Sequence, residues 1–237
     1  MAEDLKKMYR TIMDDHFPAK MEISFVDENN RQTLFYEKVT WTIDNVQKGL
    51  RYGENPGQEA ALYRMVNGNL VLGETQTIQP GRYLASDIEL LQSGKHPGKT
   101  NLTDADNSLN ILRYFSEKRG AAFVKHNNPC GVALADSLVN AYLKANMADR
   151  VAAFGGCIAL NRTVDRATAE AIVQQYAEVV VAPDFEEGVM DIFASKKNLR
   201  VVKIANIERL QSFVGQRCVE FKSLIFAVII AQWSFVP

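Results

Sequence analysis

A lysine and a histidine stand side by side in the segment with the densest set of reactive side chains, FVKHNNPCGVA, residues 123–133. Lys125 and His126 end an apolar stretch typical of a strand, and strand ends that face a crevice are where open α/β sheets place ligands. A histidine there can act as a general base, and a lysine can stabilise a developing oxyanion. A solvated lysine beside a hydrogen-bonded turn histidine fits this segment equally well, so both interpretations stay open at this point.

Cys130 follows closely after His126 and raises two further chemical interpretations. A nucleophilic cysteine needs a base within hydrogen-bond reach, and spacing along the chain does not establish that geometry. A zinc ligand in the Pro-Cys-x-x-Cys pattern of zinc deaminases needs a second thiolate where this chain has Ala133. It also needs a His-x-Glu partner, which neither His16 nor His96 supplies. We therefore expect no metal site and interpret Cys130 as a small structural residue.

Other candidate ligand contacts are spread along the chain. Arg51 and Tyr52 open the loop RYGENPGQ and could grip an anion. Asn101 stands just ahead of an expected helix, Gly155 lies where an expected strand begins, and Glu178 immediately precedes the buried strand VVVAP. A glycine at a strand start permits a close backbone approach to a ligand. Each of these residues taken alone also fits a structural role, as a loop contact, a tight turn or a solvated charge.

The elements that must position these residues follow an α/β pattern from Thr103 onward, with strands alternating with single helices. Thr103 with Asp106 is expected to cap a helix that carries Leu109 and Leu112. The expected strands lie within residues 120–131, 153–161, 177–183 and 199–204, and further helices are expected over 137–147, from Asp165, and over 186–197. A layered α/β domain is the predicted fold class.

The sequence before Thr103 and the C-terminal segment predict fewer regular elements. We expect a helix over residues 3–15, two strands within 20–39, a loop over 51–58, and a short helix around Ser86–Leu91. The uninterrupted apolar run from Leu224 to Ala231 is typical of a buried strand and is too short to cross a bilayer. Since an exposed apolar edge strand invites pairing, either a partner covers it or the sequence is cut from something longer.

The composition is that of an ordinary globular protein, with 237 residues of which 47% are hydrophobic and 23% charged. This length suffices for one large domain or two small ones. A formal net charge of −1 argues against a dedicated nucleic-acid-binding protein, and the N-terminus lacks the continuous apolar core of a secretory signal. The three scattered cysteines make no disulfide framework. A cytoplasmic protein with no membrane and no nucleic-acid partner is expected.

Five segments occur in the order found in one family, namely LRYGENPGQEAALY, TNLTDAD, FVKHNNPCGVA, AFGGCIALNRTVD and VVVAP. From about residue 49 onward the chain resembles the transformylase domain that acts on 5-aminoimidazole-4-carboxamide ribonucleotide (AICAR). In most organisms this domain is fused behind inosine monophosphate (IMP) cyclohydrolase. The family transfers a formyl group from its co-substrate 10-formyltetrahydrofolate to AICAR in purine synthesis. The resemblance implies a cytidine-deaminase-like, layered α/β/α fold with a mixed sheet, no metal, and active sites completed across a homodimer.

The resemblance also implies roles for individual residues. Lys125 and His126 match the catalytic pair, in which His126 takes the proton of the AICAR 5-amino group and Lys125 stabilises the oxyanion of the tetrahedral intermediate. The positions that match nucleotide contacts are Arg51 and Tyr52, at the phosphate and ribose end, together with Asn101, Gly155 and Glu178.

The resemblance covers only the first half of the family's domain. We expect residues 1–48 to form an N-terminal helix and hairpin extension, and residues 49–237 to form the first cytidine-deaminase-like half, with the second half absent. The residues ahead of the match are too few to form a cyclohydrolase domain, so no cyclohydrolase activity is expected. Two hypotheses remain: the catalytic first half of a formyltransferase, or a truncated nucleotide-binding module without turnover.

Overall fold

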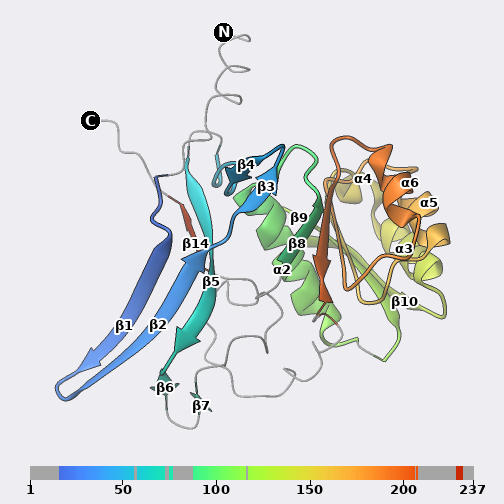
Figure 1. Ribbon diagram of the computed structural model, residues 1–237. Coiled ribbons are helices and arrows are strands. Elements are labelled where there is room, and N and C mark those ends of the chain that lie inside the picture. Colours follow the sequence, from blue (N-terminus) through green and yellow to red (C-terminus); the bar gives the residue numbers. More distant parts are fainter. Residues whose placement is uncertain are drawn as a thin grey trace. The chain divides into compact units, whose positions relative to one another are not determined.

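The computed structural model describes residues 16–55, 58–72, 75–76, 88–115, 117–205, 207 and 228–231. They belong to two compact units, one formed by Met1–Ser86 with Arg217–Pro237 and the other by Asp87–Gln216 (Figure 1). The helix expected over residues 3–15 and the first half of the expected C-terminal strand, residues 224–227, lie outside the described residues. The division expected between residues 48 and 49 rests on the resemblance and stays a prediction.

An antiparallel sheet of four strands, in the order β1-β2-β5-β14, forms the first unit. The predicted hairpin within residues 20–39 is confirmed as β1 and β2, which turn at Glu28 and Asn29. A strand in the apolar C-terminal run is confirmed as β14, which pairs with β5. The elements of this unit are β1 Lys20–Asp27, β2 Asn30–Lys38, β3 Trp41–Ile43, β4 Val46–Lys48, β5 Ala60–Gly68, β6 Val71–Leu72, β7 Thr75–Gln76 and β14 Val228–Ala231.

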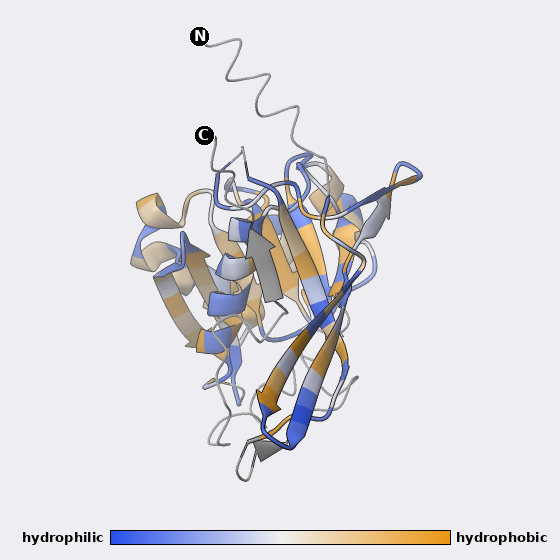
Figure 2. Ribbon diagram, turned by 90° about the vertical axis from the view of Figure 1, so that its left-hand side faces the viewer, coloured by the Kyte–Doolittle hydropathy of each residue, from blue (hydrophilic) through white to orange (hydrophobic). Residues whose placement is uncertain are grey.

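The core of the first unit lies on one face of this sheet. Hydrophilic and hydrophobic residues alternate along its long hairpin (Figure 2), as expected where successive side chains point to opposite faces. Leu34 and Tyr36 of β2 are buried against Ala61 and Tyr63 of β5. The Tyr63 hydroxyl donates a hydrogen bond to the Pro18 carbonyl (2.6 Å), which attaches the segment ahead of β1 to the sheet.

The second unit is built on a six-stranded mixed sheet in the order β10-β9-β11-β12-β13-β8. β11, β12 and β13 run parallel, whereas β9 runs antiparallel to β11 and β8 antiparallel to β13. The elements are β8 Ile88–Gln92, α2 Lys99–Leu112, β9 Arg119–Lys125, β10 Asn128–Ala135, α3 Leu138–Ala148, α4 Arg150–Ala153, β11 Cys157–Leu160, α5 Arg166–Ile172, β12 Val179–Ala182, α6 Val189–Ala194 and β13 Arg200–Ile204. The predicted strand and helix alternation is confirmed from β11 to β13.

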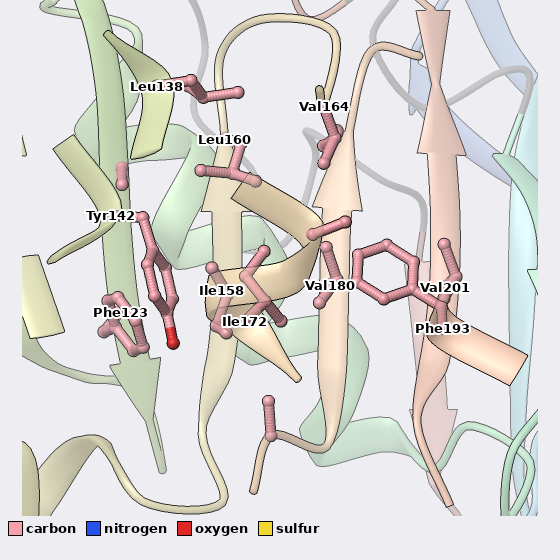
Figure 3. Close-up of a cluster of buried hydrophobic side chains, with 14 of the residues drawn as sticks. Phe123, Leu138, Tyr142, Ile158, Leu160, Val164, Ile172, Val180, Phe193 and Val201 are labelled. Atoms are coloured by element: carbon pink, nitrogen blue, oxygen red, sulfur yellow. The ribbon is translucent and has the colours of Figure 1, made fainter. Parts of the chain in front are cut away.

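Helices cover both faces of this sheet. Phe123, Ile158, Val180 and Val201, one residue from each central strand, share a buried cluster with residues of α3, α5 and α6 (Figure 3). The alternate residues of these strands point to the other face, where α2 packs against β9 and β11. A mixed α/β fold in layers is therefore confirmed. No helix within the described ranges is long and apolar enough to span a bilayer.

Side-chain caps explain why the helices begin where they do. The Ser137 hydroxyl accepts from the third residue of α3, and the Asp165 carboxylate accepts from the Thr168 backbone N–H of α5 (2.7 Å). These bonds satisfy backbone donors that have no partner inside the helix. The predicted helix start at Asp165 is confirmed, as is the predicted helix over residues 137–147.

The short helix expected around Ser86–Leu91 is wrong, because the structure has the strand β8 there. β8 pairs with β13, an element more than 100 positions further along the chain. The Gln92 side chain adds hydrogen bonds to the backbone carbonyls of Phe193, Lys196 and Leu199. Pairing with a distant strand therefore overrides the local preference of this segment.

The helix cap expected at Thr103 with Asp106 is also wrong. Helix α2 begins at Lys99, and the Thr103 hydroxyl donates to a backbone carbonyl inside the helix. The Gly98 N–H instead donates to the Asn101 side-chain oxygen (3.0 Å), which satisfies the donor that precedes the first turn. Asn101 consequently lies within the first turn of α2 and not ahead of it.

Candidate functional site

One edge of the six-stranded sheet gathers most of the candidate residues. β9 ends at Lys125, whereas β11 and β12 begin just after Gly156 and Glu178. Because β9 is antiparallel to β11, its carboxyl end meets the amino ends of β11, β12 and β13. Strand pairing aligns Val124 with Cys157, so the residues just beyond them lie side by side. The sequence predicted Lys125 at the carboxyl end of a strand. The structure shows in addition that the amino ends of three parallel strands lie at the same edge of the sheet.

His126 lies in the tight turn that joins β9 to β10. Lys125 pairs with Asn128, which leaves His126 and Asn127 as a two-residue hairpin loop. Both residues have positive φ angles, 51° and 62°, the backbone of the turn that suits the twist of a hairpin. Both side chains are exposed. The imidazole of His126 is therefore presented at the edge of the sheet beside Lys125.

Lys125 is in contact with the glycine pair that precedes β11. Its ammonium donates to the Phe154 carbonyl (2.8 Å), immediately before Gly155. Gly155 has a φ of 75°, which favours glycine, and a Cβ on Gly156 would lie 3.0 Å from the Val124 carbonyl oxygen. The two glycines thus allow this loop to pack closely against the end of β9, next to the lysine.

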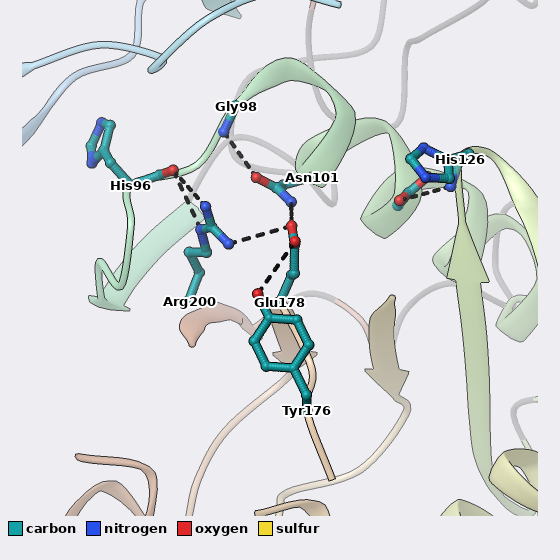
Figure 4. A network of polar contacts seen from close by, with 8 residues as sticks. His96, Gly98, Asn101, His126, Tyr176, Glu178 and Arg200 are labelled. Atoms are coloured by element: carbon teal, nitrogen blue, oxygen red, sulfur yellow. Dashed lines mark hydrogen bonds and ion pairs between the residues drawn. The ribbon is translucent and has the colours of Figure 1, made fainter. Parts of the chain in front are cut away.

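A polar network surrounds Glu178 at the start of β12 (Figure 4). The Asn101 side-chain amide donates to one carboxylate oxygen (3.0 Å), and the Tyr176 hydroxyl donates to the other (3.4 Å). The Arg200 guanidinium forms an ion pair with the carboxylate (3.5 Å) and donates to the His96 carbonyl. Only 3% of the Arg200 side chain is exposed, against 38% for Glu178. The Glu178 carboxylate is therefore held in place by Asn101, Tyr176 and Arg200 and is still partly accessible to solvent. A group that contacts a ligand needs both properties.

Asp104 connects helix α2 to the turn that carries His126. Its two carboxylate oxygens accept the backbone N–H groups of His126 (3.1 Å) and Asn127 (2.7 Å). Burial raises the pKa of Asp104, and these two hydrogen bonds act in the opposite direction. Asn101 and Asp104 are one turn apart on α2, so one helix contacts both Glu178 and the histidine turn.

The first unit holds the other two candidates. The Arg51 guanidinium lies over the Tyr52 ring, 5.2 Å from its centroid, which is a cation–π contact. The loop that follows is held by Gln58, whose side chain accepts from the Asn55 N–H (3.0 Å) and whose carbonyl accepts from the Gly53 N–H (2.8 Å). A loop at this place is confirmed for its described residues. The approach of Arg51 and Tyr52 to the other five candidates stays a prediction.

Neither described cysteine has the properties of an activated nucleophile. Burial, followed by the nearby Asp149 carboxylate, raises the pKa of Cys130, and burial raises the pKa of Cys157 much further. A thiol with a raised pKa is largely protonated at neutral pH and reacts slowly. Among the residues that the structure describes, no three His, Cys, Asp or Glu side chains are grouped to hold a metal ion.

Sequence reasoning missed three residues of this edge, namely Asp104, Tyr176 and Arg200. A signal existed for Asp104, which shares the helical stripe of Ala105, Ser108, Leu109 and Leu112, so an acidic residue stands on a face that must be buried. The signal for Arg200 is similar, because this charged residue is the first of the apolar segment RVVKI, which is typical of a buried strand. A buried charge needs a partner, and in both cases the sequence does not show which one.

Known proteins match most of this chain. The family model described as AICARFT/IMPCHase bienzyme matches residues 9–232. A bifunctional purine biosynthesis protein PurH from Thermoanaerobacter sp. (strain X514) is 42% identical over 179 residues, 76% of this chain and 32% of the relative. Proteins of the same name from Magnetococcus marinus and Caldicellulosiruptor saccharolyticus are 42% and 36% identical, over 78% and 81% of this chain. The chain spans about a third of the length of these relatives, since it covers 32–35% of them.

Proposed function

Because the chain belongs to the AICARFT/IMPCHase bienzyme family, we propose that it carries the catalytic pair that transfers a formyl group from 10-formyltetrahydrofolate to the 5-amino group of AICAR. The observation that carries the proposal is the convergence at one sheet edge of Lys125, the glycine loop and Glu178. Helix α2 ties the His126 turn to the same edge through Asp104.

The reaction needs a base because the AICAR amino group is a poor nucleophile, its lone pair being delocalised into the ring and the carboxamide. His126 takes a proton from this nitrogen as the nitrogen attacks the formyl carbon. A tetrahedral intermediate with an oxyanion forms, and Lys125 stabilises that negative charge. The bond between the formyl carbon and the folate nitrogen then breaks, and the folate nitrogen receives the proton. An ammonium has three N–H donors, so the bond of Lys125 to the Phe154 carbonyl does not exhaust it.

The nucleotide is held at both of its ends in this proposal. Arg51 and Tyr52 bind the phosphate and ribose end, where a guanidinium offers a planar pair of donors to phosphate oxygens. The cation–π contact between Arg51 and Tyr52 supports this role, because it holds the guanidinium and the tyrosine ring next to each other. Asn101, Gly155 and Glu178 line the nucleotide pocket at the sheet edge.

We further propose the architecture that the family implies. Residues 49–237 form the first of two cytidine-deaminase-like halves, residues 1–48 form an extension, and a second copy completes the active site in a cytoplasmic homodimer. The mixed sheet with helices on both faces supports the fold assignment. No metal and no nucleic acid take part in the proposed reaction.

A second function is favoured by one observation, namely that the chain spans about a third of the length of its relatives, with coverage of 32–35%. A piece of this size could bind AICAR and leave the formyl transfer to residues that it does not contain. Binding without turnover would then be the result for the unmodified chain.

The turnover test compares two lysines of the second unit. Lys125→Met removes the ammonium and keeps the length of the side chain, so formyl transfer should fall by about 10²- to 10³-fold. Lys144→Met on the exposed surface of α3 is the matched control and should retain the rate of the unmodified chain. The rate is followed as the consumption of 10-formyltetrahydrofolate in the presence of AICAR. Equal rates for all three proteins contradict the catalytic role of Lys125.

The binding test compares AICAR with its riboside, which lacks the phosphate. Arg51→Ala should weaken AICAR binding by about 10- to 100-fold, the contribution of hydrogen bonds to a charged group, and should change riboside binding by less than about threefold. Arg64→Ala, which removes an exposed arginine that forms an ion pair with Glu37 (3.9 Å) in the same unit, is the control. Calorimetry measures both ligands. If AICAR binds and no formyl transfer occurs, the nucleotide-binding module is the correct function. If Arg51→Ala weakens the binding of AICAR and of the riboside equally, Arg51 does not contact the phosphate.

A further inference from the structure

The hairpin turn that carries His126 needs outside support. Residues 126 and 127 both adopt left-handed backbone conformations, with φ angles of 51° and 62°. Glycine and asparagine tolerate this region, and histidine does so less readily. The turn is exposed, and Asn127 reaches one further partner, the side-chain amide of Asn107 on α2 (2.8 Å). A catalytic base at such a position needs a fixed anchor if its imidazole is to stay in one place.

Asp104 supplies an anchor of the required kind. Its carboxylate is buried within the unit, with 5% of the residue exposed, and it lies on the face of α2 that packs against the sheet. One oxygen accepts the His126 N–H (3.1 Å) and the other accepts the Asn127 N–H (2.7 Å). In this turn both residues hold the left-handed conformation, and their two adjacent backbone donors point to one carboxylate. A hydrogen bond to an ionised acceptor is about twice as strong as one between neutral groups.

The anchor itself is held by the helix. Asp104 lies one turn after Asn101, whose side chain accepts the Gly98 N–H and donates to Glu178. The turn of His126 and the carboxylate of Glu178 are thus both fixed to the first two turns of α2. A shift of this helix would move the proposed base and the proposed nucleotide contact together.

We propose that Asp104 is a positioning residue for the formyl transfer, because its carboxylate holds the backbone turn that aims His126 at the reacting amine. This inference rests on the proposed function. Asp104 itself touches no substrate and transfers no proton. Its effect on the rate comes from orientation, since a displacement of about 1 Å in a catalytic group can cost about 10²-fold in rate.

The experiment uses the full chain and five variants, one of which is a control. Asp104→Ala removes both acceptors, and Asp104→Asn keeps one of them. Asn127→Gly places at one turn position a residue that adopts the left-handed conformation without steric cost. The double variant Asp104→Ala/Asn127→Gly tests rescue. Asp165→Ala is a further control, since it removes a carboxylate that caps α5 elsewhere in the same unit. Amide hydrogen exchange at residues 126 and 127 is measured with the kinetics of formyl transfer.

Asp104→Ala should speed amide exchange at both turn residues by at least about tenfold, and Asp165→Ala should leave it unchanged. The rate constant should fall by at least about tenfold in Asp104→Ala, with the KM for AICAR within about threefold of the unmodified value. The double variant should recover at least about threefold of that loss, because the glycine restores the turn without the carboxylate. If Asp104→Ala fails to fold, Asp104→Asn decides through the selective loss of protection at one of the two amides.

Three results would overturn the inference. Slow exchange at residues 126 and 127 in Asp104→Ala shows that the carboxylate does not hold the turn. Fast exchange with an unchanged rate shows that the turn does not position the base. A lost rate that the glycine does not rescue assigns Asp104 to another role. If the unmodified chain transfers no formyl group, the proposed function fails for this chain, and the exchange result alone then decides whether Asp104 fixes the turn.

Discussion

Replacing His126 by asparagine should lower the rate constant of formyl transfer by about 10²- to 10⁴-fold while AICAR binding changes little, because the change removes the general base and no phosphate contact. Asparagine is chosen over alanine for a structural reason. Position 126 has a φ of 51°, and asparagine tolerates that conformation better than other non-glycine residues. The variant therefore removes the imidazole and preserves the turn, so a loss of rate reports the chemistry of the side chain.

The matched control is His16→Asn. His16 is also exposed, and its imidazole contacts Glu59 (2.6 Å) in the first unit. Single-turnover measurements separate the chemical step from binding, and calorimetry gives the affinity for AICAR. A His126→Asn protein with the rate of the unmodified chain would remove histidine from the reaction and leave Lys125 without its proposed partner. A parallel loss in His16→Asn would show that the assay responds to damage of either unit.

Replacing Arg200 by methionine should lower the free energy of unfolding by about 2–3 kcal/mol. Breaking a fully buried ion pair costs about 3–5 kcal/mol, and the cost here is smaller because 38% of the Glu178 side chain is exposed. The change also removes the donors that Arg200 offers to the His96 carbonyl. Since Glu178 loses a support, AICAR should bind about tenfold more weakly if this carboxylate contacts the nucleotide.

Lys203→Met provides the comparison on the same strand. Lys203 forms an ion pair with Asp184 (2.8 Å) in which the side chains are 25% and 53% exposed, and such pairs contribute about 0–1 kcal/mol. Urea titration of both variants measures the difference in unfolding free energy. Equal losses for Arg200→Met and Lys203→Met would contradict the importance of burial. Unchanged AICAR binding in Arg200→Met would separate this pair from the proposed nucleotide pocket.

Local patterns predicted those elements whose signals lie within the element itself. The hairpin of β1 and β2 follows from alternation around a polar turn, and the start of α5 follows from the Asp165 cap. The buried strand β12 follows from its continuous apolar run. The strand β8 was missed because its structure comes from pairing with β13, which no local window contains. The start of α2 was missed because Gly98 and Asn101 outcompete the stronger capping pattern at Thr103.

The candidate site divides in the same way. Residue types indicated His126 as a candidate base and Lys125 as a candidate oxyanion contact, from their order in the chain alone, and these roles stay predictions. Which groups face each other depends on the direction of β9 relative to β11, and the sequence does not state that direction. Asp104 shows the limit most clearly, because its partners are two backbone N–H groups that any residues other than proline would offer at positions 126 and 127. When a carboxylate binds backbone N–H groups, the residue types of its partners do not reveal the contact, so it cannot be read from the sequence.

The pairing of β14 with β5 has a consequence for the order in which the protein forms during synthesis. Every strand of the six-stranded sheet leaves the ribosome before β14, whereas the sheet of the first unit receives its β14 strand only when residues 228–231 have emerged. Contacts between distant parts of a chain form slowly, because a long loop must close first. The second unit is contiguous in sequence and can therefore fold while translation continues, whereas the edge of β5 that pairs with β14 stays open until β14 has been made.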